Sequence, residues 1–224
     1  MDITALSKST GDYLKGLYTL DQTGEPISTN ALAALLDVSP ASVTNMLKRL
    51  AGEEPALVVY TKHYGATLTP AGRNAALRLL RRHRLVELFL VRVLGYTWDE
   101  IHAEAEELEH VISQHFEDSL ADLLGEPDFD PHGDPIPNRD LLLPAQHLIL
   151  LSRLPIAQMS FIRRVAGKQP EMLQHLGGLG LLPGVCVEVM ARNPFDQTVR
   201  LRIGENGESV LGHALANAIW VEPA

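Results

Sequence analysis

Residues 37–50 have the sequence DVSPASVTNMLKRL, and this stretch decides the fold of the N-terminal part of the chain. Ser39 followed by Pro40 is typical of a helix start, because serine caps the first free amides and proline fits the first helical position. The apolar residues that follow recur at helical spacing and predict a buried stripe: Val43, Met46, Leu47 and Leu50. The sequence therefore predicts a capped amphipathic helix with a polar outer face.

The sequence on either side of this helix completes a recognisable order of elements. Before it, Leu6, Leu14, Leu17 and Tyr18 predict a helix that ends at the turn 21–24, and a short helix begins near Ser28 or Thr29. After it, residues 57–61 and 66–69 predict two strands joined by a turn at Gly65. Two helices, a capped helix and a hairpin are typical of a winged helix-turn-helix.

The polar face of the capped helix carries short hydrogen-bonding side chains first and basic side chains further on. This distribution suits base edges and phosphates in a major groove. The residues expected to contact double-stranded DNA are Ser39, Pro40, Ser42, Thr44, Asn45, Lys48 and, at the hairpin tip, Lys62. The pattern leaves one alternative open, a helical unit packed on a hairpin without nucleic acid.

Two long helices are expected next. Thr69-Pro70 opens a helix that runs to about Leu94, and Thr97 caps another that ends at Gly125. Their wide apolar faces indicate a homodimer interface. Residues 126–140, EPDFDPHGDPIPNRD, predict an irregular linker.

The character of the chain changes near residue 145. Short β-rich runs at 158–165, 185–191, 198–203 and 218–223 predict a small antiparallel barrel, interrupted by helices at 170–181 and 213–219. The expected fold is mainly α with a C-terminal β part. Its domains are a DNA-binding domain (1–71), a helical dimerisation and metal-binding domain (72–144) and a small β-barrel (145–224).

Composition restricts the class of protein. The 224 residues contain one cysteine, Cys186, which excludes an intramolecular disulfide framework. We find neither a leader nor a run of roughly 18 apolar residues, so we expect a cytoplasmic protein without a membrane partner. The net charge of −9 is concentrated in residues 85–144, which hold 15 acidic and 2 basic residues, while residues 1–84 hold 7 and 10. This asymmetry indicates cations as partners of the middle and anions as partners of the N-terminal part.

Metal-binding residue types gather in the acidic part. His102, Glu106, Glu109 and His110 have the spacing that places side chains on one helix face. His83 and Glu87 form an i, i+4 pair on the preceding helix. Imidazole and carboxylate suit divalent transition metals, and the absence of thiolate argues against a structural zinc site. A solvated acidic helix face is the alternative.

Two other classes of function remain open at this point. A di-metal carboxylate enzyme needs a Glu-x-x-His motif from each of two helices, and this chain has one, at Glu107 and His110. No catalytic triad or phosphate-binding glycine loop is found, so we expect no enzyme activity and no small organic substrate. The other class is a winged-helix regulator that senses a small organic ligand.

The chain resembles the diphtheria toxin repressor family of metal-dependent transcriptional regulators. The matching stretches are SKSTGDYLKGLYTL, DVSPASVTNMLKRL, LTPAGR, RRHRLVELFLVRVLG, IHAEAEELEHVIS and PHGDPIP, and the C-terminal barrel is similar to the SH3-like domain of the longer members. The resemblance implies a homodimer that represses transcription with a divalent metal as co-repressor. It implies a primary metal site of Asp12, Glu106, Glu109 and His110. It also implies an ancillary site of His83, Glu87, His102 and Glu171.

The resemblance also bears on the metal. Iron-sensing members have sulfur ligands where Asp12 and Glu106 stand, and oxygen ligands favour the harder Mn2+. The manganese branch, however, has an acidic residue where this chain has Lys15, and it typically lacks the barrel. We expect a Mn2+-dependent repressor of metal homeostasis genes, with Fe2+ as the alternative and other divalent metals able to bind in vitro.

Overall fold

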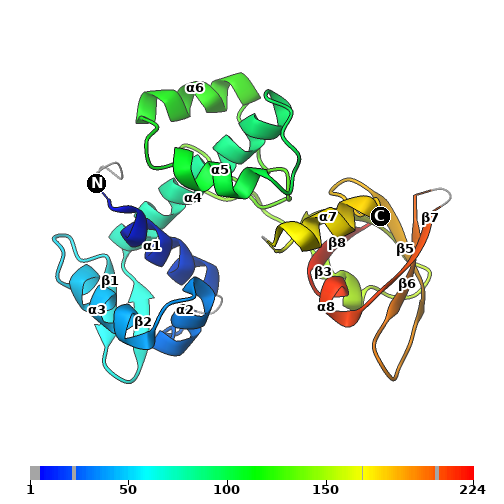
Figure 1. Cartoon of the computed structure of the whole chain (residues 1–224), viewed down its shortest axis with the longest axis horizontal. Coiled ribbons are helices and arrows are strands. Elements are labelled where there is room, and N and C mark those ends of the chain that lie inside the picture. The colour runs from blue at the N-terminus through cyan, green and yellow to red at the C-terminus, as the bar shows by residue number, and fades with distance from the viewer. Residues whose placement is uncertain (1–5, 22–23, 168, 205–206) are drawn as a thin grey trace. The chain divides into compact units, whose positions relative to one another are not determined.

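The computed structural model describes residues 6–21, 24–167, 169–204 and 207–224 (Figure 1). The chain divides into two compact units, which we describe one at a time. The first contains residues 1–83, 107–118 and 137–142, and the second contains residues 84–106, 119–136 and 143–224.

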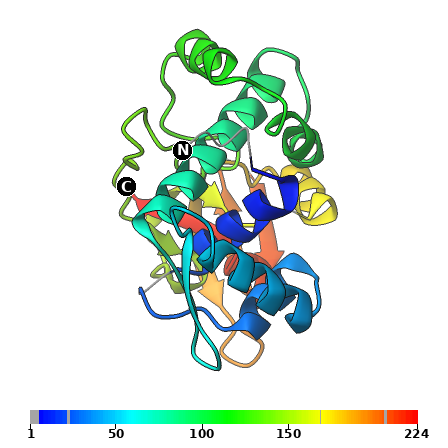
Figure 2. The ribbon, with the colours of Figure 1, turned by 90° about the vertical axis from the view of Figure 1, so that its left-hand side faces the viewer.

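The first unit opens with three helices and a hairpin, in the predicted order. Their bounds are α1 Lys8–Leu20, α2 Thr29–Leu36, α3 Pro40–Ala51, β1 Val58–Thr61 and β2 Gly65–Leu68. A serine caps each helix: the side chains of Ser7, Ser28 and Ser39 each accept a hydrogen bond from the amide three residues further on. Leu6 lies outside α1, because the cap at Ser7 fixes the start of the helix. The hairpin tip projects beyond the helices of this unit in both views (Figures 1 and 2).

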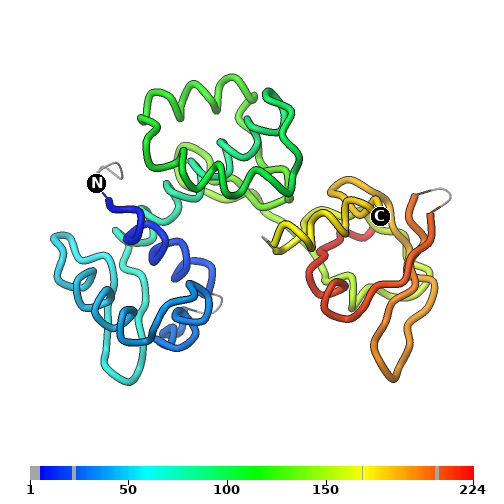
Figure 3. Tube along the Cα trace, in the orientation of Figure 1, coloured from blue at the N-terminus to red at the C-terminus, as the bar shows by residue number. Residues whose placement is uncertain are grey.

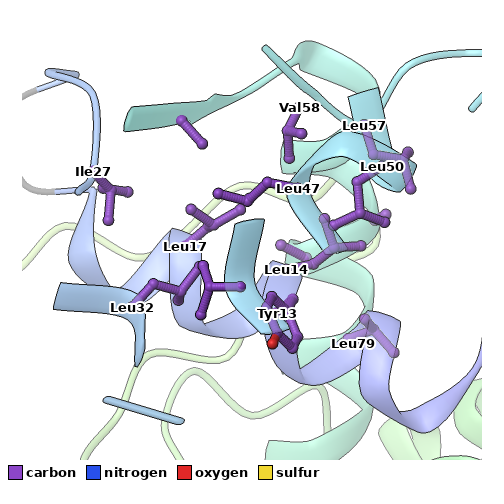
Figure 4. Close-up of a cluster of buried hydrophobic side chains, with 14 of the residues drawn as sticks. Tyr13, Leu14, Leu17, Ile27, Leu32, Leu47, Leu50, Leu57, Val58 and Leu79 are labelled. Carbon is purple, nitrogen blue, oxygen red and sulfur yellow. The ribbon is translucent and has the colours of Figure 1, made fainter. Parts of the chain in front are cut away.

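The core of the first unit is built from the apolar stripes of these helices (Figure 4). Leu14 and Leu17 of α1, Leu32 of α2 and Leu47 of α3 are fully buried. Burying such a side chain stabilises the fold by about 1.5–3 kcal/mol. This packing fixes α3 so that its polar face points outward.

The helix that follows the hairpin is α4, Pro70–Arg92, and the Thr69 hydroxyl accepts a hydrogen bond from the Gly72 amide at its start. The single helix predicted to follow is wrong: the structure has α5, Ile101–Leu108, and α6, Gln114–Leu124. The Ser113 hydroxyl accepts a hydrogen bond from the Phe116 amide and so caps the start of α6. This cap makes α6 a separate helix from α5. Residues 109–111 therefore lie in a turn.

Residues 126–140 are irregular, as predicted, but they do not form an exposed linker. Ile136 packs with Leu85 and Leu88 in a small core of the second unit. Gly133 has a φ of +86°, and a Cβ there would lie 1.8 Å from the Arg163 carbonyl oxygen, so this position requires glycine. The segment thus packs closely against the C-terminal strands.

The C-terminal part forms a six-stranded antiparallel sheet with the order β3-β8-β4-β5-β6-β7. Figure 3 follows the path of the chain through this part, where the colour runs to red at the C-terminus. The strands are β3 Ile149–Leu150, β4 Met159–Val165, β5 Cys186–Arg192, β6 Val199–Ile203, β7 Gly207–Leu211 and β8 Ile219–Pro223. Helix α7, Pro170–Gly178, and helix α8, His213–Ala216, interrupt them where helices were predicted. The sequence patterns missed the short β3 and the edge strand β7, whose Val210 is exposed.

Candidate metal centres and DNA-binding face

The first candidate metal centre lies in the first unit. Asp12 comes from α1, whereas Glu109 and His110 come from the turn after α5. One ligand atom from each of these residues lies within 4.8 Å of those from the other two. Asp12 is thus brought together with a carboxylate and an imidazole that stand 97 and 98 positions later in the sequence.

Glu109 is fully buried and both of its carboxylate oxygens accept hydrogen bonds. Lys15 Nζ donates to Oε1 at 2.7 Å, and His83 Nδ1 donates to Oε2 at 2.6 Å. Burial disfavours the charged form, but the contacts of His83 and then of Lys15 outweigh it and lower the pKa of Glu109. Glu109 is therefore held as a buried carboxylate.

His110 and Arg82 complete the surroundings of the first centre. His110 Nε2 is buried, lies 3.3 Å from Glu109 Oε1 and makes no hydrogen bond within the described part of the chain. Arg82 Nη1 donates to the Glu109 carbonyl at 3.2 Å, and its Nε donates to Glu117 at 3.0 Å. A buried imidazole nitrogen without a hydrogen bond beside two carboxylates fits a divalent metal ion.

A second candidate metal centre lies in the second unit and was not predicted. Ligand atoms of Glu87, Asp130 and His132 lie within 4.8 Å of one another, and all three residues are buried. His132 Nε2 lies 2.8 Å from the Trp98 carbonyl, so this nitrogen must donate. The other nitrogen, Nδ1, then carries the lone pair and lies 4.0 Å from Glu87 Oε2. This is how a metal-binding histidine is oriented by its neighbours.

Asp130 of the second centre is buried beside other carboxylates. Burial raises the pKa of Asp130 well above its ordinary value, and the charges of Glu87 and Asp134 raise it further. The opposing charge of Arg84, 3.8 Å away, only partly compensates. Two buried carboxylates repel one another unless a proton or a cation lies between them, so this donor set also fits a divalent ion.

The other ligands that the sequence predicts have the following contacts. His102 Nδ1 is 3.2 Å from Glu87 Oε1, and its Nε2 is 3.8 Å from Glu106 Oε1 on α5. His83 contacts Glu109, which was assigned to the other site. Glu171 is exposed in the first turn of α7, and none of the metal-ligating groups found among the described residues includes it.

The polar face of α3 is exposed as predicted. Ser39, Pro40, Ser42, Asn45 and Lys48 are accessible to solvent, and Thr44 is half-buried. A groove of about 410 Å³ runs from this face to the hairpin tip and is lined by Ser28, Thr29, Asn30, Thr44, Lys48, Tyr60, Lys62, His63, Tyr64 and Gly65. The contribution of α2 was not predicted, although the capping Ser28 marks an exposed start of this helix.

One basic residue of α3 does not belong to this face. The Arg49 guanidinium donates to the Thr10 hydroxyl at 2.7 Å, which ties α3 to α1.

Three family models match successive parts of the chain. Residues 5–66 match "Iron dependent repressor, N-terminal DNA binding domain", and residues 69–138 match "Iron dependent repressor, metal binding and dimerisation domain". Residues 149–223 match the FeoA domain, which is SH3-like. The chain belongs to the iron-dependent repressor family. It is a metal-dependent, DNA-binding transcriptional repressor, not an enzyme.

Individual members of this family are similar along nearly the whole chain. The diphtheria toxin repressor of Corynebacterium diphtheriae is 33% identical over 231 residues, covering 97% of this chain and 98% of the relative. The iron-dependent repressor IdeR of Mycobacterium tuberculosis is 30% identical over 230 residues, with the same coverage. A solved structure described as a manganese-dependent transcriptional repressor in complex with manganese is 36% identical, covers 96% of this chain and 100% of that chain, and has a TM-score of 0.87.

Within the described ranges, no helix is both long and apolar enough to cross a bilayer.

Proposed function

We propose that the chain is a Mn2+-activated repressor whose primary metal site is the first centre. The observation that carries this proposal is the meeting of Asp12, Glu109 and the unused nitrogen of His110. We add Glu106 as the fourth ligand because it stands on α5, three residues before Glu109. These donors are oxygen and nitrogen only, which favours Mn2+ over softer ions.

Fe2+ is the second candidate metal. It accepts the same oxygen and nitrogen donors, and the family models that match this chain describe iron-dependent repressors. A comparison of the two ions on the same protein distinguishes these proposals.

We propose that the metal activates DNA binding by joining α1 to the turn after α5. Asp12 belongs to the helix that packs against α2 and α3 in one core, so fixing α1 restricts the position of the recognition helix. A bound ion can shift this equilibrium only through its higher affinity for the DNA-competent arrangement. Moving the population from 1:99 to 99:1 requires a difference of about 5.5 kcal/mol.

The second centre is proposed as an ancillary site. Glu87, Asp130 and His132 are its ligands, and His102 lies beside Glu87. His83 is assigned to the first centre because it donates to Glu109. Glu171 is left out of the proposed site.

The remaining assignments follow the division into residues 1–71, 72–144 and 145–224. We propose that operator DNA is contacted by Ser39, Pro40, Ser42, Thr44, Asn45, Lys48 and Lys62. The exposed apolar residues Val111, Phe116 and Leu123 are proposed to meet a second copy of the chain. We place the protein in the cytoplasm, where operator DNA is accessible.

The test is a DNA-binding titration against Mn2+, Fe2+ and Zn2+, with a chelator control. Fluorescence anisotropy should show high DNA affinity with Mn2+ at concentrations where Zn2+ gives less activation. Asp12→Ala should still bind metal, since the other ligands remain, but its DNA affinity should rise little when metal is added. An Asp12→Ala protein that responds to Mn2+ like the parent would remove α1 from the mechanism.

A further inference from the structure

A buried lysine occupies the first centre together with the acidic ligands. Lys15 stands on α1, three residues after Asp12, and its side chain is only 10% exposed. Its ammonium lies 2.7 Å from Glu109 Oε1 and 3.7 Å from Asp12 Oδ1. A positive charge of the protein is therefore placed among the oxygens that we propose as metal ligands, and the inference below rests on that proposal.

This contact stabilises the buried carboxylate without a metal ion. Glu109 is fully buried, and a buried carboxylate without a partner is strongly destabilising. Lys15 satisfies one of its oxygens and His83 the other. Both carboxylate oxygens of Glu109 thus have a hydrogen-bond donor without any metal ion.

The same contact opposes the arrival of a divalent ion. An ion that binds Glu109 must approach the Lys15 ammonium, which already donates a hydrogen bond to one carboxylate oxygen of Glu109. Either the lysine contact breaks or two positive charges stay close together in a buried site, and both cost free energy. Because Lys15 and Asp12 stand on the same helix, an ion that binds Asp12 also comes close to this ammonium.

We propose that Lys15 is a resident cation of the metal centre, which stabilises Glu109 in the metal-free repressor and lowers its affinity for the activating metal. In this way Lys15 sets the metal concentration at which repression begins. It is a positioning and affinity-setting residue, and it is not itself a metal ligand.

The test compares Lys15→Met with Lys8→Met. Methionine keeps much of the length of lysine and removes its charge. Lys8 is the matched control, because it lies on the same helix and pairs with the exposed Glu107, which is not among the proposed ligands. Both substitutions are made in a His132→Ala background, so that the second centre contributes less to the titration.

Calorimetric titration with Mn2+, without DNA, should show tighter binding by Lys15→Met, by about tenfold or more, since 1.4 kcal/mol corresponds to tenfold. Lys8→Met should stay within about twofold of the background protein. Without metal, Lys15→Met should melt at a lower temperature than the background protein. Saturating Mn2+ should remove this difference. Equal or weaker Mn2+ binding by Lys15→Met would overturn the proposal.

A second variant covers the case in which Lys15→Met does not fold, and the parent protein shows whether the role of Lys15 or the proposed function has failed. If Lys15→Met does not fold, Lys15→Gln retains a hydrogen-bond donor without the charge, and it should also bind Mn2+ more tightly than the background protein. An unchanged affinity of that variant would likewise overturn the proposal. Failure of the parent chain to bind Mn2+ at all would refute the proposed function, whereas a binding parent with unresponsive Lys15 variants would refute only the role of Lys15.

Discussion

The two candidate metal centres use the same kinds of donor and differ in their charge balance. Each combines at least two carboxylates with one imidazole. In the first centre, His83 and Lys15 lower the pKa of Glu109 despite its burial, whereas in the second centre burial and neighbouring carboxylates raise the pKa of Asp130. The donor set alone therefore does not determine how a centre behaves without metal, because the resident positive charges decide it.

We expect the largest difference between the two centres in their contribution to Mn2+-dependent DNA binding. His110→Ala should abolish the increase in DNA affinity that Mn2+ produces, which we expect to be on the order of 100-fold. His132→Ala should reduce that increase by no more than about tenfold, because the second centre is ancillary. Anisotropy titrations on a labelled operator measure both. Equal losses in the two variants would show that the centres act as one.

A second comparison concerns stability without metal. Glu109→Gln removes the carboxylate that the buried Lys15 ammonium contacts at 2.7 Å and should lower the free energy of unfolding by about 3 kcal/mol. Glu87→Gln removes a like charge beside Asp130 and should leave stability within about 1 kcal/mol of the parent or raise it. Urea denaturation in the presence of a chelator measures both variants. A larger loss for Glu87→Gln than for Glu109→Gln would reverse the comparison.

The smallest expected effect is on the pH dependence of stability. A raised pKa means that the folded protein binds the Asp130 proton more tightly than the unfolded chain does, where the pKa is about 3.9. Ionised Asp130 therefore destabilises the metal-free protein at neutral pH, and this cost disappears as the pH falls through the raised pKa. Asp130→Asn should be more stable than the parent by about 1 kcal/mol at pH 7.5.

That advantage should shrink as the pH is lowered toward 5, where Asp130 of the parent takes up its proton. Ionised Glu109 has the opposite effect on stability from ionised Asp130. Its lowered pKa stabilises the folded protein above about pH 4.3, and this stabilisation is lost in stronger acid. Thermal melts at several pH values, with chelator, measure the difference. A pH-independent difference between Asp130→Asn and the parent would show that Asp130 does not titrate in this way.

The local elements and the first centre could be predicted from the sequence to a large extent. The serine caps, the Ser39-Pro40 helix start and the hairpin depend on neighbouring residues, and the structure confirms them. The spacing of the acidic stretch predicts Glu109 and His110 as metal ligands, the resemblance implies Asp12, and the structure places the three residues together.

The second centre could not be predicted, for a physical reason. Asp130 and His132 stand in a segment rich in proline and glycine, whose composition predicts only irregular structure. Their burial depends on distant partners, such as the Trp98 carbonyl that orients His132 and the Val165 amide that donates to its carbonyl. The role of Lys15 is similarly hidden, because its partner Glu109 is 94 residues away.

The turn that carries Glu109 and His110 can open and close without unfolding of the rest of the protein. The amides of Val111 and Ile112 both donate to the Leu108 carbonyl and close the turn outside any helix. Such a turn opens by a local fluctuation that costs less free energy than global unfolding. Hydrogen–deuterium exchange of these two amides should therefore slow when a metal ion holds the turn closed, and it reports occupancy of the centre in the absence of DNA.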